Sequence, residues 1–139
     1  MSVYVISDGS GFVKIGFARN ICERIKQLQC GNARTLVLLY EIDTYTARYY
    51  DCDLEHALHQ KYAEYRVMND NYGQPSEWFR DDCVADIDRL DSDAIYNLMR
   101  DYFPRRRVFG DAKIYKFKDG RRTKVERGLQ ELHSLASDI

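Results

Sequence analysis

The stretch VYVISDGSGFVKIGFARNICERIKQL, residues 3 to 28, decides the fold of the amino-terminal part of the chain. Residues 3 to 6 and residues 12 to 17 are rich in the β-branched and aromatic side chains that strands favour. The sequence SDGSG between them has turn chemistry, because its two glycines can adopt a positive φ. The stretch therefore predicts a β-hairpin at the start of the chain.

The pairing register of this hairpin decides which side chains share a face. We expect Ile6 to pair with Phe12 across the turn. Tyr4 then lies opposite Lys14, with both side chains on one face of the hairpin. Gly16 has no side chain and leaves open space beside them. The expected result is a tyrosine and a lysine next to a gap.

A helix is expected directly after the hairpin. Asn20 is a suitable N-cap, and Glu23 three residues later completes a capping box. Arg24 flanks the apolar stripe of this helix, so its guanidinium group can reach the edge of the hairpin. The stripe consists of Ile21, Ile25 and Leu28. A tyrosine, a lysine and an arginine therefore converge over the gap.

Several short segments in a fixed order carry a resemblance to a known family. They are Ser2-Val3-Tyr4, Lys14-Ile15-Gly16, Arg24, Gln27-Leu28-Gln29, Gly31-Asn32, Leu54-Glu55, Leu58-His59 and Glu77-Trp78-Phe79. In this set the chain resembles the GIY-YIG endonuclease superfamily, and within it the KIG-variant branch of the phage reading-frame and meiotically up-regulated protein type. The resemblance covers roughly residues 2 to 80. The departures are Ser2-Val3 for the usual Gly-Ile, and Lys14 for the second tyrosine.

Hydrolysis of a phosphodiester needs an activated water, charge neutralisation at the phosphate and a stabilised leaving oxygen. A hard divalent ion with oxygen ligands serves these needs, and we expect Mg²⁺ or Mn²⁺. Glu55 is the candidate ligand, because on a helix it lies about 100° from Leu54, beside the apolar stripe. The resemblance implies the same role, since the family uses a single helix glutamate, and no other carboxylate is expected at the site. A solvated helix glutamate is the alternative.

Tyr4 is the candidate general base or positioner of the attacking water. A free tyrosine with a pKa of about 10 is a poor base unless cations such as Lys14 and Arg24 lie nearby. Lys14 is alternatively the base itself or a phosphate ligand. Arg24 is expected to clamp the phosphate with its planar fork. Strand packing, a solvent-facing lysine and an intrahelical ion pair are the structural alternatives for these three residues.

His59 lies one turn after Glu55, so the two side chains share a face of the expected helix. It is a candidate general acid for the leaving oxygen, or a residue that orients Glu55. A histidine that is hydrogen-bonded for structure is the alternative. The sequence assigns no role to Glu77, whereas Trp78 and Phe79 are expected in the core.

The remaining elements follow from hydrophobic periodicity and turn residues. Residues 35 to 42 are expected to form a central third strand, and residues 44 to 66 a helix. Beyond them we expect a loop at 68 to 76, a short extended piece at 77 to 79, a helix over 82 to 102 broken near 91 to 93, a strand at 113 to 117 and a last helix over 123 to 135.

Composition limits the class of protein. With 139 residues, 45% hydrophobic and 31% charged, one domain with an appendage is expected. No apolar run is long enough to span a membrane, so a cytoplasmic protein is expected, and the resemblance implies a bacterial or phage-infected cell. The four cysteines include no CxxC pair, which argues against structural zinc and for reduced thiols.

Charge is unevenly distributed along the chain. Residues 1 to 80 carry nine Lys or Arg against ten Asp or Glu, and residues 81 to 103 carry two against seven. Residues 104 to 139 carry ten against five. We expect the run Arg105-Arg106-Arg107 in this last segment to bind nucleic acid. The alternative is that these arginines dock on the acidic helix before them.

Taken together, the sequence predicts an α+β fold with a small three-stranded antiparallel sheet flanked by helices. Residues 1 to 80 are expected to form a nuclease-like domain, and residues 81 to 139 an acidic helix followed by a helical, basic appendage. With the resemblance, the residues predict metal-dependent cleavage of DNA, with RNA left open and no membrane partner. The alternatives are a non-catalytic nucleic-acid-binding module and a phage or bacterial regulatory protein that acts on a protein partner. The sequence does not decide the oligomeric state.

Overall fold

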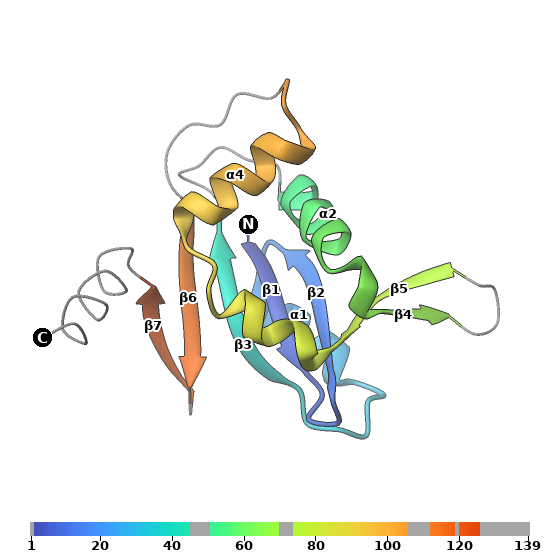
Figure 1. Cartoon of the computed structure of the whole chain (residues 1–139). Coiled ribbons are helices and arrows are strands. Elements are labelled where there is room, and N and C mark those ends of the chain that lie inside the picture. The colour runs from blue at the N-terminus through green and yellow to red at the C-terminus, as the bar shows by residue number, and fades with distance from the viewer. Residues whose placement is uncertain (1, 45–50, 70–73, 106–111, 119, 126–139) are drawn as a thin grey trace, which may run out of the picture.

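The computed structural model of the chain describes residues 2–44, 51–69, 74–105, 112–118 and 120–125 (Figure 1). Its elements are β1 (Ser2–Ser7), β2 (Phe12–Ala18), α1 (Ile21–Gln29), β3 (Val37–Asp43), α2 (Asp51–Lys61), η1 (Ala63–Tyr65), β4 (Arg66–Asn69), β5 (Gln74–Arg80), η2 (Asp81–Cys83), α3 (Val84–Ile87), α4 (Ser92–Tyr102), β6 (Lys113–Lys118) and β7 (Arg121–Val125). None of the described helices has the length and apolar character needed to cross a bilayer.

The strands form one seven-stranded antiparallel sheet in the order β4-β5-β2-β1-β3-β6-β7. The α+β class is therefore confirmed, but the expected sheet of three strands is wrong. Two hairpins extend the central β2-β1-β3 unit, because β5 pairs with the open edge of β2 and β6 pairs with the open edge of β3. Unpaired strand edges expose main-chain donors and acceptors, and these two hairpins satisfy them.

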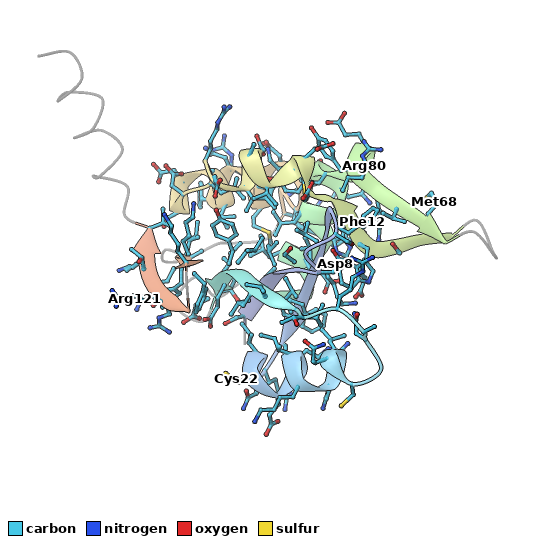
Figure 2. All side chains as sticks on the ribbon, turned by 90° about the horizontal axis from the view of Figure 1, so that it is seen from below. Asp8, Phe12, Cys22, Met68, Arg80 and Arg121 are labelled. Carbon is cyan, nitrogen blue, oxygen red and sulfur yellow. The ribbon has the colours of Figure 1, made fainter. Side chains whose placement is uncertain are left out.

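Helices cover the two faces of the sheet unequally. Of the helices that the structure describes, α2, α3 and α4 lie over one face, and only α1 lies over the other, where Cys22 marks it in Figure 2. The core under α2, α3 and α4 includes Val3, Val5, Val13, Ile15, Leu54, Leu58, Ile87, Ile95 and Ile114. A smaller core under α1 is built from Tyr4, Ile6 and Leu36, against which Ile21, Ile25 and Leu28 pack. The division into residues 1 to 80 and 81 to 139 stays a prediction.

The amino-terminal hairpin forms as expected, but with a different register. Ile6 pairs with Lys14 and Tyr4 pairs with Gly16, so the expected pairing of Ile6 with Phe12 is wrong. The difference is two residues along β2, which preserves the parity of the strand. Tyr4 and Lys14 therefore do share the face covered by α1, as diagonal rather than directly opposite neighbours.

The turn explains this register. The main-chain N–H of Asp8 donates to the carbonyl oxygen of Phe12 at 3.1 Å, so only three residues remain in the loop. The Asp8 carboxylate accepts from the main-chain N–H of Ser10 at 2.8 Å and of Phe12 at 3.3 Å. Gly9 and Gly11 have φ values of 75° and 103°, which L side chains rarely adopt. The aspartate and the two glycines together close the turn tightly.

The helix expected over residues 44 to 66 is shorter in the structure. Its described part is α2, which ends at Lys61, while residues 45–50 lie outside the described residues. The loop expected over residues 68 to 76 overlaps the ends of β4 and β5, and is wrong there because these short strands pair with each other. Polar residues that read as a loop are tolerated because β4 is an edge strand.

The carboxy-terminal elements are partly as expected. The break near residues 91 to 93 is confirmed, because the Asp91 side chain caps α4 by accepting from the main-chain N–H of Ala94 at 2.8 Å. The strand over residues 113 to 117 is confirmed as β6. The last helix is wrong for residues 123 to 125, which pair with β6 in β7. The rest of that expected helix lies outside the described residues.

Candidate functional site

The candidate site forms where β5 leaves the edge of β2. β5 pairs with β2 only along residues 12 to 14 of β2. Directly beyond them, Nε2 of His59 contacts the carbonyl oxygen of Ile15 at 2.8 Å, so that α2 takes the place of β5. Glu55 lies one turn earlier on α2. We refer to the cluster as the β2-edge site; it contains Tyr4, Lys14, Arg24, Glu55, His59, Arg66 and Glu77.

Tyr4 lies across Gly16 on the α1 face of the sheet. A Cβ atom on Gly16 would lie 2.5 Å from Oη and 2.6 Å from Cζ of Tyr4. The phenol ring is 1% exposed, so it depends on the missing side chain of this glycine. The gap expected beside Gly16 therefore exists, but the ring of Tyr4 itself fills it.

Lys14 is a buried strand lysine rather than a solvent-facing one. Its ammonium group donates to Oε2 of Glu77 at 2.8 Å, and lies 5.8 Å from the centre of the Trp78 ring. Burial raises the pKa of Glu77, but the hydrogen bond and charge of Lys14 outweigh it and hold this pKa below its ordinary value. Glu77 is therefore a carboxylate at the site, and the expectation that Glu55 stands there alone is wrong.

Glu55 is buried, with 9% of its surface exposed, so the alternative of a solvated helix glutamate is wrong. Burial raises its pKa to about 7, and the neighbouring Glu77 carboxylate acts in the same direction. The positive charges of Lys14 and Arg66 oppose this shift but do not cancel it. A carboxyl group that changes charge near neutral pH, beside a second carboxylate, is typical of functional sites.

His59 is held as a neutral imidazole by its two neighbours. The carbonyl oxygen of Ile15 can only accept, so Nε2 carries the proton and donates to it. Nδ1 then accepts from Nη2 of Arg66 at 3.3 Å. Burial lowers the pKa of His59, and the charge of Arg66 lowers it further, against the hydrogen bond to Ile15. Nε2 also lies 3.6 Å from Oε1 of Glu55, in a position to orient that carboxyl group.

Arg24 reaches the site from α1. Asn20 caps this helix, because its side chain accepts from the main-chain N–H of Glu23 at 3.2 Å. The Arg24 side chain is partly exposed, and its Nη1 donates to Gln27 at 3.4 Å. Burial raises the pKa of Glu77, and Lys14 and His59 lower it. The charge of Arg24 lowers the same pKa by a smaller amount. Arg24 thus lies near enough to act with the other charges.

The donor set fits a hard divalent cation. No group of three or more His, Cys, Asp or Glu residues suited to a metal occurs in the described part of the chain. Mg²⁺, however, usually keeps several waters and needs only one or two carboxylates. Glu55 and Glu77 supply two carboxylates. Burial is the main cause of the raised pKa of Glu55, and the charge of Glu77 and a hydrogen bond to its carboxyl group add to it. Glu55 and Glu77 would hold such an ion once Glu55 has released its proton.

The structure describes only one of the three arginines that are expected to bind nucleic acid. Arg105 is exposed, whereas Arg106 and Arg107 lie outside the described residues. An ion pair joins the acidic and basic segments among the described residues: Nζ of Lys116 lies 3.0 Å from Oδ1 of Asp88. The Ser92 hydroxyl group also donates to the carbonyl oxygen of Ala112 at 2.7 Å. The role of the three arginines stays a prediction.

Sequence reasoning missed Arg66 and gave Glu77 no role. Arg66 belongs to β4, and its Nε donates to the carbonyl oxygen of Ser76 at 2.7 Å, which fixes its guanidinium beside His59. The sequence signal for Glu77 was its place in the Glu77-Trp78-Phe79 segment of the family resemblance, which by itself assigned it no role. For Arg66 no local signal existed, because the strand pairing that places it is non-local.

Comparison with known proteins gives a family. The T5orf172 domain matches residues 1–100 of the chain. The match includes every residue of the β2-edge site and ends within α4, before β6 and β7. Nothing among the curated proteins or the solved structures matches the chain.

Proposed function

The chain belongs to the T5orf172 domain family, in the GIY-YIG and phage-type nuclease-like group, and we propose that it is a metal-dependent endonuclease that hydrolyses DNA. Membership in this family indicates a nuclease or DNA-binding role. The observation that carries the proposal of catalysis is the buried Glu55, with a pKa of about 7, beside Glu77 and Lys14. Lysine in place of the second tyrosine supports an assignment to the KIG-variant branch.

Glu55 and Glu77 are the proposed ligands of Mg²⁺ or Mn²⁺. Such an ion, when bound, polarises the phosphate and makes a coordinated water more acidic. Glu55 must release its proton to act as a ligand, and its pKa of about 7 makes this possible near neutral pH. Nε2 of His59 donates its proton to the Ile15 carbonyl oxygen and lies 3.6 Å from Oε1 of Glu55, so the ring packs beside the carboxyl group and limits its orientations.

Lys14 is proposed as a phosphate ligand. Its ammonium group is fixed by Glu77 at 2.8 Å and carries a positive charge at the strand edge, as binding of a phosphate oxygen requires. Tyr4, diagonal to Lys14 on the same face, is proposed to position the attacking water, which requires water to reach its buried hydroxyl group. Arg24 adds a planar guanidinium at the exposed side of the site, where it can hold a second phosphate oxygen.

General-acid catalysis by His59 is the less favoured role. The proton on Nε2 is donated to the Ile15 carbonyl, and the Arg66 guanidinium occupies the Nδ1 side. An orienting role for His59 requires no proton transfer and uses the contacts already present. Protonation of the leaving oxygen is therefore assigned to water.

A non-catalytic binding module is the second function that the family allows. A buried carboxyl group beside a second carboxylate is costly to maintain, and carboxylates facing a phosphate would weaken binding rather than strengthen it. A metal ion bound by the carboxylate oxygens would offset this cost in an enzyme, whereas a binding module has no such ion to offset it. The burial of Glu55 therefore favours the enzyme over the binding module.

The proposal is tested by nicking of supercoiled plasmid DNA in Mg²⁺ or Mn²⁺. Glu55→Ala should lower the cleavage rate by about 10³-fold or more, since it removes the proposed metal ligand, and should keep most of the DNA binding. Glu64→Ala, which changes an exposed glutamate close to α2, is the matched control and should cut like the wild type. Undiminished cutting by Glu55→Ala would refute the ligand assignment. Binding without cutting by the wild type would establish the binding module instead.

A further inference from the structure

The hairpin formed by β6 and β7 lies outside the matched residues 1–100, yet it continues the sheet of the β2-edge site. Residues 113 to 125 contain six Lys or Arg and one Asp, which makes them one of the most basic segments of the chain. β6 pairs with β3, and β7 pairs with β6. Figure 2 shows Arg121 of β7 and Met68 of β4 toward opposite ends of the sheet.

Strand parity divides the side chains of this hairpin between two faces. Residues that are paired across an antiparallel ladder share a face. Tyr115 pairs with Lys124, and Phe117 pairs with Arg122. We refer to the side of the hairpin that carries Lys113, Tyr115, Phe117, Arg122 and Lys124 as the hairpin face. The opposite side carries Ile114, Lys116, Lys118, Arg121, Thr123 and Val125.

The hairpin face is on the same side of the sheet as Tyr4. The ladder pairs run in one row from Gly16 through Tyr4, Glu41 and Tyr115 to Lys124. Four strand spacings separate the ends of this row, which is about 19 Å at about 4.8 Å per spacing. This distance corresponds to roughly six base pairs of duplex DNA at 3.4 Å per pair.

Two cations of the hairpin face are presented to solvent. Arg122 and Lys124 are exposed, and neither forms an ion pair with the residues that the structure describes. The guanidinium of Arg122 lies 4.0 Å from the centre of the Tyr115 ring, so the ring supports the planar fork. A supported fork loses less side-chain entropy when it binds a phosphate.

Among the residues that the structure describes, the acidic side chains of β3 on this side of the sheet do not neutralise these cations. Glu41 and Asp43 both lie on β3, two strands away from β7. Glu41 accepts from the hydroxyl group of Ser2 at 3.1 Å, and Asp43 pairs in register with Lys113. Positive potential therefore remains on β7.

From this arrangement we infer that the hairpin face binds the phosphate backbone of duplex DNA whose cleavage site lies at the β2-edge site. The inference rests on the proposed function. In this inference, β6 and β7 bind the DNA about half a helical turn away from the phosphate that reacts. The bound chemistry is that of phosphodiester oxygens, with no reading of bases.

The opposite side of the same hairpin offers a matched control. Lys118 and Arg121 form a ladder pair on that side, and both are exposed. Two double variants are compared. One is Arg122→Gln/Lys124→Gln and the other is Lys118→Gln/Arg121→Gln, and each removes two positive charges from the same hairpin. The two double variants therefore differ mainly in the face that loses charge.

The experiment measures binding of a labelled duplex by fluorescence anisotropy in EDTA, over a series of salt concentrations. Arg122→Gln/Lys124→Gln should weaken binding about tenfold or more and reduce the slope of log Kd against log salt by about 1.8, which is about 0.9 for each lost phosphate contact. Lys118→Gln/Arg121→Gln should change the slope by clearly less. Lys124→Gln alone leaves the stacked Arg122 in place and should reduce the slope by about 0.9.

Each result has one meaning. Equal slope changes in the two double variants, or none in either, would overturn the assignment of the hairpin face. The proposed function would survive that result if the wild type still nicked plasmid and Glu55→Ala did not. Wild-type protein that binds no duplex at low salt would overturn both. Thermal unfolding of each variant, expected within a few degrees of the wild type, confirms that the comparison is made between folded proteins.

Discussion

The β2-edge site and the hairpin face are both rich in charged side chains, but they hold their charge in different ways. At the β2-edge site, Lys14, Glu55 and His59 are buried, and each contacts another polar or charged group. On the hairpin face, Arg122 and Lys124 are exposed. Within the described residues, the ring of Tyr115 lies against the Arg122 guanidinium. The β2-edge site is a network of buried groups that hold one another in place, and the hairpin face is a surface of solvent-exposed cations.

The difference follows from the cost of burying charge. A buried ionised group must have partners, and the partners then hold it in a single geometry, as chemistry requires. An exposed cation is solvated and screened, so it can follow a polyanion whose phosphates are not in fixed positions. A position-sensitive site and an adaptable surface can therefore occupy one continuous sheet.

The largest effect is expected on the pH dependence of folding at the β2-edge site. The pKa of Glu55 is raised from 4.5 to about 7, so the folded protein holds this proton more tightly than the unfolded chain. The resulting stabilisation is complete below pH 4.5 and is lost as the pH rises through 7, by up to about 3 kcal/mol. Glu55→Gln should remove this loss and be more stable than the wild type at pH 8.

Chemical denaturation in EDTA at pH 5 and pH 8 measures this difference. Asp88→Asn changes a partly exposed carboxylate paired with Lys116 and serves as the control, with an expected change within about 1 kcal/mol. If the free energy of unfolding of Glu55→Gln and of the wild type changes identically between pH 5 and pH 8, burial does not raise the pKa of Glu55 at the β2-edge site.

A glycine in each region gives the next effect in size. Gly16→Ala would place a Cβ atom 2.5 Å from Oη of Tyr4, and should lower the free energy of unfolding by about 2 kcal/mol or more because the buried ring must move. Gly120→Ala meets nothing within 4 Å and is opposed only by its φ of 75°, which costs about 1 kcal/mol. Urea unfolding compares the two, and a larger cost at Gly120 would contradict the packing of Tyr4.

The ion pair between Lys14 and Glu77 should contribute less. Lys14→Tyr restores the commoner residue of the superfamily and should reduce stability by about 1 kcal/mol, since Glu77 is partly exposed and keeps water as a partner. The variant should retain part of its nicking activity, because a tyrosine enters the same space. Complete loss of nicking by a folded variant would show that the charge of lysine is itself required.

The smallest effect is expected at the base of the hairpin. Lys116→Ala removes the 3.0 Å ion pair with Asp88, in which both side chains are more than 40% exposed. Pairs of this kind contribute about 0.2 to 1 kcal/mol, and less at high salt. Thermal unfolding at low and high salt should show a small difference that disappears with salt. A larger, salt-independent loss would mean that packing of the lysine stem on Tyr40 matters more than its charge.

Local patterns in the sequence were sufficient for the central part of the fold. The period of two in β1 and β2, the turn glycines and the Asn20 cap each act within a few residues, and they predicted the hairpin, α1 and the shared face of Tyr4 and Lys14. The register was missed because it depends on the Asp8 carboxylate closing the turn, a detail of side-chain geometry.

Features that depend on distant pairing were the ones not found. β4 has four residues and β7 has five, and both are rich in polar side chains, which resemble loop or helix sequence until a neighbouring strand is present. The partnership of Glu55 with Glu77 joins α2 to β5, and that of His59 with Arg66 depends on β4. Such contacts are decided by the three-dimensional arrangement rather than by the spacing of residues.

The position of β7 at the end of the sheet has a further consequence for the behaviour of the protein in solution. No strand lies beyond β7 within the described ranges, so its outer main-chain groups offer an edge to which another chain can add. Arg121, Arg122 and Lys124 give that edge the same positive charge in every copy, and like charges directly opposite each other oppose edge-to-edge pairing. The cations of this five-residue strand therefore disfavour the pairing of two copies along this edge, whatever else they bind.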